Sequence, residues 1–219
     1  EPIPMNAFLR AIAALSLVAT SLSPARAADP AEAAAKAGLV PVAQEHFDHY
    51  FSRPGPGIDG FRMLHVEACT VEFRKHWLRD QNRGRPLSSR VTEREADRIR
   101  ERLAATCRET LVEELTGATF NVVAEAGEGV LTLRPAIVEF DLFAPEVDAP
   151  TQVRSVSPSA GEMTLNLDFI VDGSLVARAV DRLRDRDSTL RQRTRVSNEF
   201  DTRAMLKRWT GHVREALAD

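Results

Sequence analysis

The sequence predicts one α+β domain, a two-layer sandwich with two long helices on one face of a four- to five-stranded, mainly antiparallel sheet. A β-hairpin pattern lies at 161–186, and amphipathic helix patterns lie at 92–116 and 199–218. Because a hairpin alone is not stable in water, its apolar face needs the helices as cover. With 219 residues, 43% of them hydrophobic, the chain can bury one core of this kind.

The hairpin pattern is the clearest strand signal. Its apolar residues alternate with polar ones: Met163, Leu165, Leu167, Phe169 and Val171. Asp172-Gly173 suits a type I′ turn, in which both central residues have positive φ. The chain from Ser174 to Leu183 is therefore expected to fold back beside the first strand.

The stretch from Phe61 to Phe73 is predicted to be the first strand of the domain. Its apolar residues change parity along the run, which indicates a bulge or burial on both faces. The polar and basic stretch from Arg79 to Arg90 is expected to be a surface loop.

A long helix is predicted to follow this loop. Thr92 and Glu95 form a capping-box pattern, in which each side chain accepts a hydrogen bond from the other residue's backbone. The apolar residues that follow recur every four positions: Ile99, Leu103, Cys107, Leu111 and Leu115. The pattern predicts an amphipathic helix that lies on the sheet and ends near Gly117.

Two further strands are predicted at 119–123 and 130–143, and 144–160 is expected to be a loop. The apolar parity of the second strand shifts at Arg134-Pro135. Because proline lacks a backbone donor, we expect a bulge or an edge position there.

Ser197 or Asn198 is expected to cap the final helix. Its apolar stripe is Phe200, Met205, Trp209, Val213 and Leu217. Phe200 and Trp209 are expected to anchor this helix in the core.

The amino terminus resembles a secretory signal peptide. A weakly basic lead at Met5–Arg10 precedes an apolar run at 11–22 and the small-x-small pattern of Ala25–Ala27. This order predicts cleavage between Ala27 and Ala28, with residues 1–4 as an upstream extension. The alternative is an uncleaved amphipathic or anchoring helix. The apolar run is shorter than the roughly 20 residues of a transmembrane helix. We therefore expect a soluble, periplasmic or otherwise exported chain without a transmembrane helix.

The mature chain is expected to comprise two parts. Residues 28–60 are expected to form a partly disordered N-terminal arm, because they are rich in alanine and end near a Pro-Gly-Pro-Gly stretch. Residues 61–219 are expected to form the single α+β domain.

Cys69 and Cys107 have two open interpretations. Export permits a disulfide, which would join the first strand to the long helix. The alternative is a pair of buried free thiols.

Composition and motifs argue against several classes of function. A net charge of −3 argues against a nucleic-acid binder. The sequence has no nucleophile elbow, phosphate loop, Cys-x-x-Cys or His-Glu-x-x-His pattern. These absences favour a protein that is not an enzyme, and no cofactor is expected.

His46, Asp48 and His49 are the best candidates for metal ligands. Imidazole and carboxylate groups suit zinc, which takes three or four ligands. The alternative is an ordinary polar arm, because the sequence identifies no fourth ligand.

Asp181 shares its parity with apolar residues of the second hairpin strand, which places a carboxylate on the buried face. A buried charge needs a partner, so Arg134 or backbone donors are expected beside it. Asp181 is then either a polar tie near a strand end or an acid that binds a ligand.

Arg182 and Arg184 belong to an arginine series that is a candidate cationic rim for lipid headgroups, polysaccharide or another acidic partner. The series is Arg178, Arg182, Arg184, Arg186, Arg191, Arg193 and Arg195. Aspartates interleave with it, so the alternative is a partly neutralised, solvated strand face.

Four stretches together resemble the domain of unknown function 3313 family of bacterial envelope proteins. They are Gly127–Ile137, Gly161–Leu165, Leu175–Arg182 and the helix around Trp209. The resemblance covers 61–219 and implies the fold and the envelope compartment, since the family has no established catalytic residues. Many members look like outer-membrane lipoproteins, but this chain lacks a cysteine near the expected cleavage site.

Three functions remain as hypotheses. The first is an exported, non-enzymatic binding or scaffolding module for an envelope protein or an acidic envelope component. The second is a carrier of a small molecule or lipid, with a pocket between sheet and helices that opens through 144–160. The third is a metal-dependent enzyme that uses His46, Asp48 and His49. The sequence does not determine the strand order or the oligomeric state.

Overall fold

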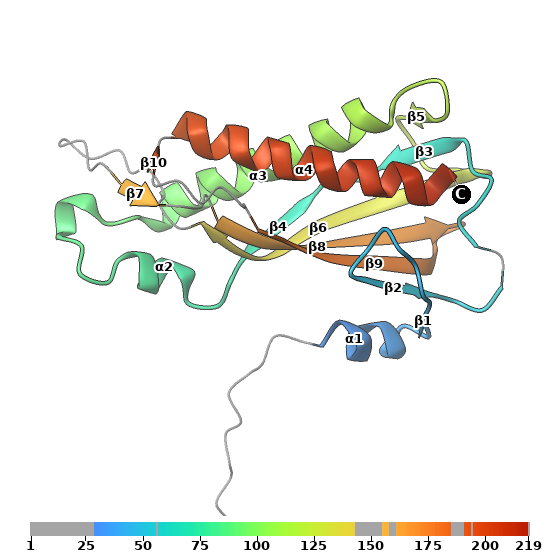
Figure 1. Cartoon of the computed structure of the whole chain (residues 1–219), viewed down its shortest axis with the longest axis horizontal. Helices are drawn as coiled ribbons and strands as arrows, with labels where there is room; N and C mark the ends of the chain where they lie inside the picture. The colour runs from blue at the N-terminus through green and yellow to red at the C-terminus, as the bar shows by residue number, and fades with distance from the viewer. Residues whose placement is uncertain are drawn as a thin grey trace, which may run out of the picture.

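A computed structural model describes residues 29–55, 57–142, 155–157, 161–184, 191–193 and 195–218. This part of the chain is α+β, with an eight-stranded sheet. Helices α3 (Glu93–Leu115) and α4 (Arg195–Ala218) lie on the same face of that sheet (Figure 1). A separate two-stranded sheet joins β7 (Ser155–Ser157) to β10 (Arg191–Arg193). The predicted class is confirmed, but the sheet is larger than the expected four to five strands.

The main sheet has the strand order β1-β2-β9-β8-β6-β3-β5, and β4 also pairs with β6. The strands are β1 (Val40–Pro41), β2 (His49–Ser52), β3 (Met63–Val66), β4 (Thr70–Phe73), β5 (Asn121–Val123), β6 (Val130–Leu142), β8 (Gly161–Val171) and β9 (Ser174–Arg184). The run from β1 to β6 is antiparallel, whereas β3 and β4 lie parallel to β6, and β5 lies parallel to β3. The sheet is therefore mixed.

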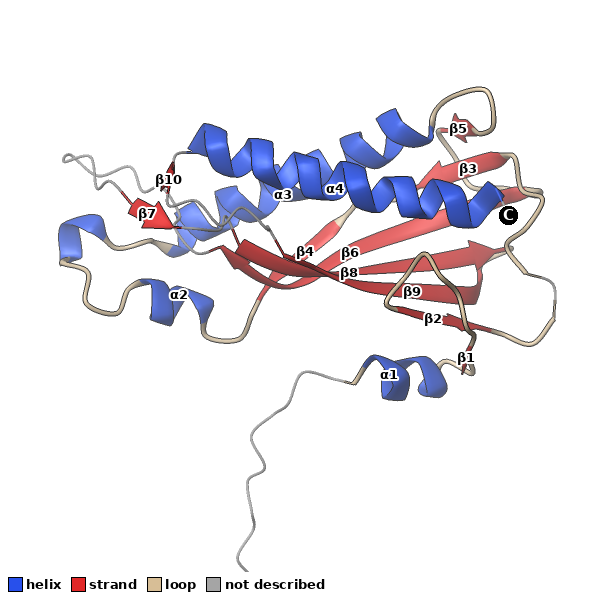
Figure 2. Ribbon diagram, viewed as in Figure 1, coloured by secondary structure: helices blue, strands red, loops and turns tan. Residues whose placement is uncertain are grey.

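The hairpin of β8 and β9 forms the centre of the sheet (Figure 2). Asp172 and Gly173 have φ values of 48° and 74°, as a type I′ turn requires. The strand register shifts by one residue between Phe169 and Ile170. The hairpin therefore forms where the sequence predicts it, with a bulge near its turn.

The core lies between the sheet and the two long helices. Its fully buried side chains include Leu131, Leu133, Ile137, Leu165, Leu167, Phe169, Leu111, Trp209 and Val213. Helix α3 begins with the predicted capping box of Thr92 and Glu95. Helix α4 begins at Arg195, before the two expected caps. Phe200 is 73% exposed, so its expected place in the core is wrong.

The predicted strand at 61–73 is in fact two strands, β3 and β4, which both pair with β6. The pairing passes from Val66 opposite Leu133 to Thr70 opposite Ala136, so Pro135 lies opposite the gap. A residue without an N–H is tolerated where the neighbouring strand is interrupted. The irregularity expected at Arg134-Pro135 is present on this side of β6, where the register changes by one residue between these two pairs, whereas the register against β8 shifts between Val138 and Asp141.

The N-terminal arm contributes to the main sheet, although it was expected to lie outside the domain. Strand β2 pairs with β9 along its whole length. Helix α1 (Pro30–Lys36) lies on the face opposite α3 and α4 (Figure 1). There Ala34 packs in a small cluster with Leu39, Phe51 and Val180.

A short helix, α2 (Trp77–Gln81), and a 3-10 turn, η1 (Leu87–Ser89), connect β4 to α3. Helix α2 lies at the end of the molecule opposite the carboxyl terminus (Figure 1). Within the described ranges, no helix is long and apolar enough to cross a membrane.

Candidate functional site

Asp181 is a buried tie between three parts of the fold. Its Oδ1 accepts a hydrogen bond from the Asp48 backbone N–H at 2.7 Å, and its Oδ2 accepts one from Trp209 Nε1 at 2.8 Å. Asp48 Oδ2 in turn accepts from the Arg182 backbone N–H at 2.8 Å. Burial raises the pKa of Asp181, and the two donors partly oppose that rise. This arrangement is that of a structural tie.

Arg134 does not contact Asp181 but forms a bidentate pair with Glu67. Its Nε lies 2.6 Å from Glu67 Oε2, and its Nη2 lies 3.1 Å from Oε1. The hydrogen bond from Arg134 holds the pKa of Glu67 below its ordinary value. Of the two partners expected for Asp181, the structure places one backbone donor there, the Asp48 N–H, and not the guanidinium; the second donor is the Trp209 indole, which was not expected.

The arginines of β9 are matched by carboxylates on β8. Arg182 Nη2 lies 2.7 Å from Glu162 Oε1, and Arg184 Nε lies 2.8 Å from Glu162 Oε2. Arg178 pairs with Asp168 in a bidentate geometry. The described part of the expected cationic rim is therefore a partly neutralised strand face.

His46, Asp48 and His49 do not converge on one point. His46 Nδ1 lies 3.6 Å from Glu215 Oε2, the Asp48 carboxylate faces the Arg182 backbone, and the His49 ring stacks on Phe51. No three His, Cys, Asp or Glu side chains of the described ranges are placed to hold a metal ion. The geometry does not assemble the expected metal site.

Cys69 and Cys107 are joined by a disulfide, with their Cα atoms 6.1 Å apart. Cys69 lies in the gap between β3 and β4, not within a strand as expected. Cys107 lies on the buried face of α3. The bond therefore fixes the interrupted part of the sheet to the helix layer.

Buried side chains of the sheet and of the two long helices pack together in the described part of the core. A half-open pocket of about 280 Å³ lies beside the arm and the end of α4. It is lined by Gln44, Glu45, His46, Tyr50, Ile58, Asp59 and Ala216. Burial, with a smaller effect of Asp59, raises the pKa of Tyr50 to about 12. Ligand pockets usually enclose roughly 300–1,000 Å³, so this one is small.

A strongly basic region lies at the opposite end of the molecule, at residues 74–90, and we call it the arginine lobe. It carries six cationic side chains: Arg74, Lys75, Arg79, Arg83, Arg85 and Arg90. Asp80 is the only carboxylate within 74–90, which leaves this segment a formal charge of +5 in a chain whose total is −3; Arg74 also pairs with Asp141, at the end of β6. This local excess distinguishes the lobe from the paired arginines of β9.

The base of the lobe is fixed to the end of β6. Trp77 is buried, and its ring stacks on Phe73 with centroids 4.0 Å apart. Trp77 Nε1 and Gln81 Nε2 both donate to the Leu142 carbonyl, at 3.1 and 2.9 Å. Arg74 Nε donates to Asp141 Oδ2 at 2.6 Å. These contacts hold α2 in one position relative to the sheet.

The loop of the lobe is closed at its neck and shaped at its tip. The Asn82 side chain donates to the Val91 carbonyl at 2.8 Å and accepts from the Val91 N–H at 2.7 Å. At the tip, the Ser89 N–H and hydroxyl donate to the Pro86 carbonyl at 3.0 and 3.2 Å. Leu87 stands in this turn with 82% of its surface exposed. The loop therefore presents its tip in a defined conformation.

One carboxylate serves three guanidinium groups in the lobe. Asp80 oxygens lie 2.9 Å from Arg74 Nη1, 3.2 Å from Arg79 Nη2 and 3.9 Å from Arg83 Nη2. The hydrogen bond from Arg74 is the main reason that the pKa of Asp80 lies below its ordinary value. Asp80 therefore stays ionised, but its one negative charge cannot neutralise all three guanidinium groups.

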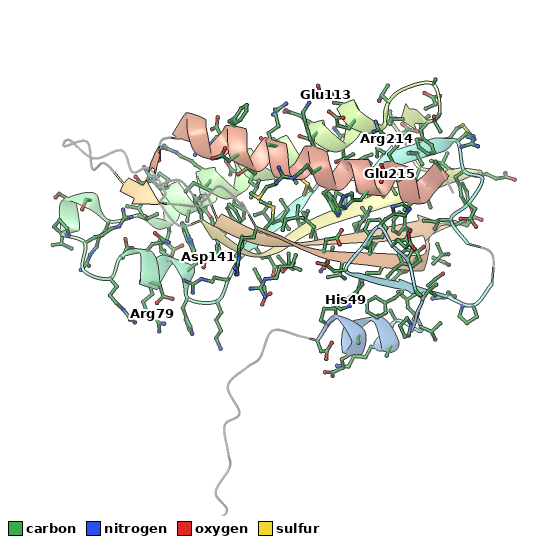
Figure 3. The ribbon with its side chains drawn as sticks, viewed as in Figure 1. His49, Arg79, Glu113, Asp141, Arg214 and Glu215 are labelled. Atoms are coloured by element: carbon green, nitrogen blue, oxygen red, sulfur yellow. A yellow bond between two sulfur atoms is a disulfide. The ribbon has the colours of Figure 1, made fainter. Side chains whose placement is uncertain are left out.

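Arg85 and Arg90 contact backbone carbonyls of the same loop, at 3.5 and 3.3 Å. A guanidinium has five N–H donors, so most of these donors are available to an anion. Figure 3 places Arg79 and Asp141 at this end of the molecule, far from His49 and Glu215. The segment 79–90, expected to be a surface loop, contains the end of α2 and the turn η1. The sequence signal that identifies this site is its local net charge.

No family model and no curated protein matches the chain. Among solved structures, the chain is similar to the crystal structure of a neuraminyllactose-binding hemagglutinin homolog from Helicobacter pylori. The identity is 11%, 73% of this chain and 84% of that chain are covered, and the TM-score is 0.34. A similarity at this level carries no information on what this chain binds.

Proposed function

We propose that this chain is a non-enzymatic binding module of the bacterial envelope, and that its arginine lobe binds an acidic partner. The observation that carries the proposal is the +5 charge of 74–90 on a well-fixed loop. The rest of the chain has a formal charge of −8, since −3 less +5 is −8. A polyanion is therefore attracted to the lobe and repelled elsewhere, which would orient the bound molecule.

The structure of the lobe favours binding in two ways. Guanidinium groups bind phosphate, sulfate and carboxylate groups through paired hydrogen bonds, and arginine supplies five of the six cations. The neck formed by Asn82 and Val91 keeps the loop ordered before binding. A preordered loop loses less conformational entropy when the complex forms.

The envelope location rests on the signal-peptide pattern and on the resemblance to the domain of unknown function 3313 family. In this proposal the precursor is cut between Ala27 and Ala28, and the mature chain lies in the periplasm. Sequencing the amino terminus of the chain recovered from a periplasmic extract tests this. A chain that stays in the cytoplasm with Met5 or an earlier residue at its start would contradict the location.

Retention on immobilised heparin tests the binding function, because heparin is a polyanion that has no lipid layer. The test variant combines Arg83→Gln, Arg85→Gln and Arg90→Gln. Its matched control combines Arg62→Gln, Arg208→Gln and Arg214→Gln, which remove the same charge from exposed positions outside the lobe. We expect the lobe variant to elute at much lower salt than the wild type and the control to elute near it. Equal shifts in the two variants would show that overall charge, not the lobe, causes retention.

A further inference from the structure

We propose that the acidic partner is the surface of an anionic phospholipid bilayer, which Leu87 enters while the surrounding arginines bind lipid phosphates. This inference rests on the proposed function, because it specifies what the arginine lobe binds. It adds a role for the one apolar side chain at the tip of the lobe.

Leu87 is the reason to prefer a bilayer over other anions. At 82% exposure it is the most exposed of the large hydrophobic side chains that the described ranges leave open to solvent. A single exposed leucine is ordinary on a protein surface. This one stands within four positions of Arg83, Arg85 and Arg90, in a turn that the Ser89 hydrogen bonds to Pro86 hold in place. The lobe therefore presents an exposed apolar side chain in a turn that arginines flank in the sequence.

An anionic bilayer offers the matching order of groups. Its phosphates form an outer anionic layer, and its acyl chains lie directly beneath them. Nucleic acids and acidic polysaccharides supply the charge but no apolar layer for Leu87. Arginine also suits the phosphodiester group, because its planar guanidinium donates two parallel hydrogen bonds.

The expected attachment is peripheral and reversible. One leucine buries too little apolar surface to anchor a protein, and the arginines add attraction only where lipids are anionic. Trp77 is buried at the base of the lobe and is not available as an interfacial anchor. Binding should therefore weaken steeply as salt is raised.

Co-sedimentation of the full chain with vesicles tests the inference. One set of vesicles is phosphatidylcholine alone, and the other contains equal parts of phosphatidylglycerol and phosphatidylcholine. We expect binding to the mixed vesicles only. The variant with Arg83, Arg85 and Arg90 changed to Gln should lower the partition coefficient by about a hundredfold, because each arginine near an anionic surface raises partition by roughly fivefold. The matched control at Arg62, Arg208 and Arg214 should bind like the wild type.

Leu87→Ser isolates the apolar contribution. We expect it to lower partition by about tenfold, as loss of one buried leucine does. Val42→Ser, at an exposed apolar position outside the lobe, should have no effect. In a further variant, Leu87→Trp, tryptophan emission should shift to the blue with mixed vesicles, because the two natural tryptophans are already buried.

The outcomes separate this inference from the proposed function. Retention on heparin with no binding to mixed vesicles overturns the bilayer and leaves a soluble polyanion or an acidic protein as the partner. The same conclusion follows if Leu87→Ser partitions like the wild type and the emission of Leu87→Trp does not shift with mixed vesicles. Absence of binding to both heparin and vesicles overturns the proposed function itself.

Discussion

Trp209 on α4 and Asp181 on β9 are joined by a buried hydrogen bond, 2.8 Å from Nε1 to Oδ2. The other oxygen of the same carboxylate accepts the Asp48 N–H from the N-terminal arm. One side chain, only 4% exposed, thus links the helix layer, the central hairpin and the arm. Its ionised form depends on these donors, because burial alone raises its pKa.

Trp209→Phe should destabilise the fold in a pH-dependent way. The change keeps an aromatic ring but removes the donor to Asp181, so the cost at neutral pH should be about 1–3 kcal/mol. The folded-state pKa of Asp181 lies above its unfolded value, so its contribution to stability is greatest in acid and falls as pH rises through the folded pKa. Without the donor this pKa rises further, and the fall is larger. Urea unfolding at acidic and neutral pH measures the difference.

Trp77→Phe is the matched control for this variant. Trp77 is also buried, but its indole donates to the Leu142 carbonyl, which does not titrate. Its loss should cost the same free energy of unfolding at both pH values. If Trp209→Phe showed the same flat profile, Asp181 would not be the group that responds to the lost donor.

Tyr50 should ionise only near pH 12. It is the one tyrosine of the sequence, so phenolate absorbance reports its titration alone. Burial, then the nearby Asp59, raises its pKa from 10.0 to about 12. Its contribution to stability should be complete below about pH 10 and lost as pH rises through about 12. Asp59→Asn should lower the pKa in part. Half-ionisation near pH 10 in a chain that is still folded by circular dichroism would contradict the assignment.

Reduction of the disulfide should destabilise the fold strongly. The bond between Cys69 and Cys107 spans 38 residues, and closing a loop of that length in the unfolded chain is worth about 4 kcal/mol. Urea unfolding with and without a reductant measures the loss. The Cys69→Ala/Cys107→Ala variant should match the reduced wild type and should itself ignore the reductant. Free thiols in the oxidised, folded protein would show that the bond is not formed.

Two glycines should respond to alanine with opposite signs. At Gly161, φ is 156° and an added Cβ would lie 2.3 Å from the Asp141 carbonyl oxygen. Gly161→Ala must displace the β6 or β8 backbone, so we expect a loss of about 1–3 kcal/mol. Gly211 lies inside α4, where a Cβ meets nothing within 4 Å. Gly211→Ala should therefore stabilise the fold by about 1 kcal/mol. Equal effects in urea unfolding would contradict the geometry at Gly161.

Asn82→Ala should open the arginine lobe without unfolding the domain. The change removes both side-chain hydrogen bonds that close the neck at Val91. Brief digestion with trypsin should then cut faster after Arg83 and Arg90, while the thermal midpoint changes little. Gln81→Ala is a useful comparison, because its side chain bonds to Leu142 and not across the neck. Equal cutting in the two variants would show that Asn82 does not control the loop.

The elements that sequence analysis placed well are those with local signals. Helix α3 carries its own start at Thr92 and a regular apolar period, and the hairpin carries its own turn at Asp172-Gly173. Strand β2 has four residues, and its partner on β9 lies more than a hundred positions away, so no local pattern marks it. Phe200 was misplaced for a related reason. A helical period shows which face of α4 is apolar, but not how far along the helix other residues pack against that face, and Phe200 is exposed.

The misplacement of the cationic site has a definite cause in the hairpin register. An unbroken two-residue turn would set Glu162 opposite Leu183, since Val171 pairs with Ser174. The bulge between Phe169 and Ile170 shifts by one residue every pair that lies farther from the turn. Glu162 therefore lies opposite Arg184. Strand parity shows which face an arginine occupies, but the carboxylate beside it depends on that bulge. The net charge of 74–90 does not depend on how strands pair, so the residues of this segment alone identify the arginine lobe.

The two strands at the ends of the strand order are very short. β1 is only Val40–Pro41, and proline offers no N–H to a further strand. β5, at the other end, has three residues. Growth of the sheet by edge-to-edge addition of another chain is therefore disfavoured, and concentrated protein should resist cross-β aggregation. A partner that recognises its target by strand addition would find little template at these two edges.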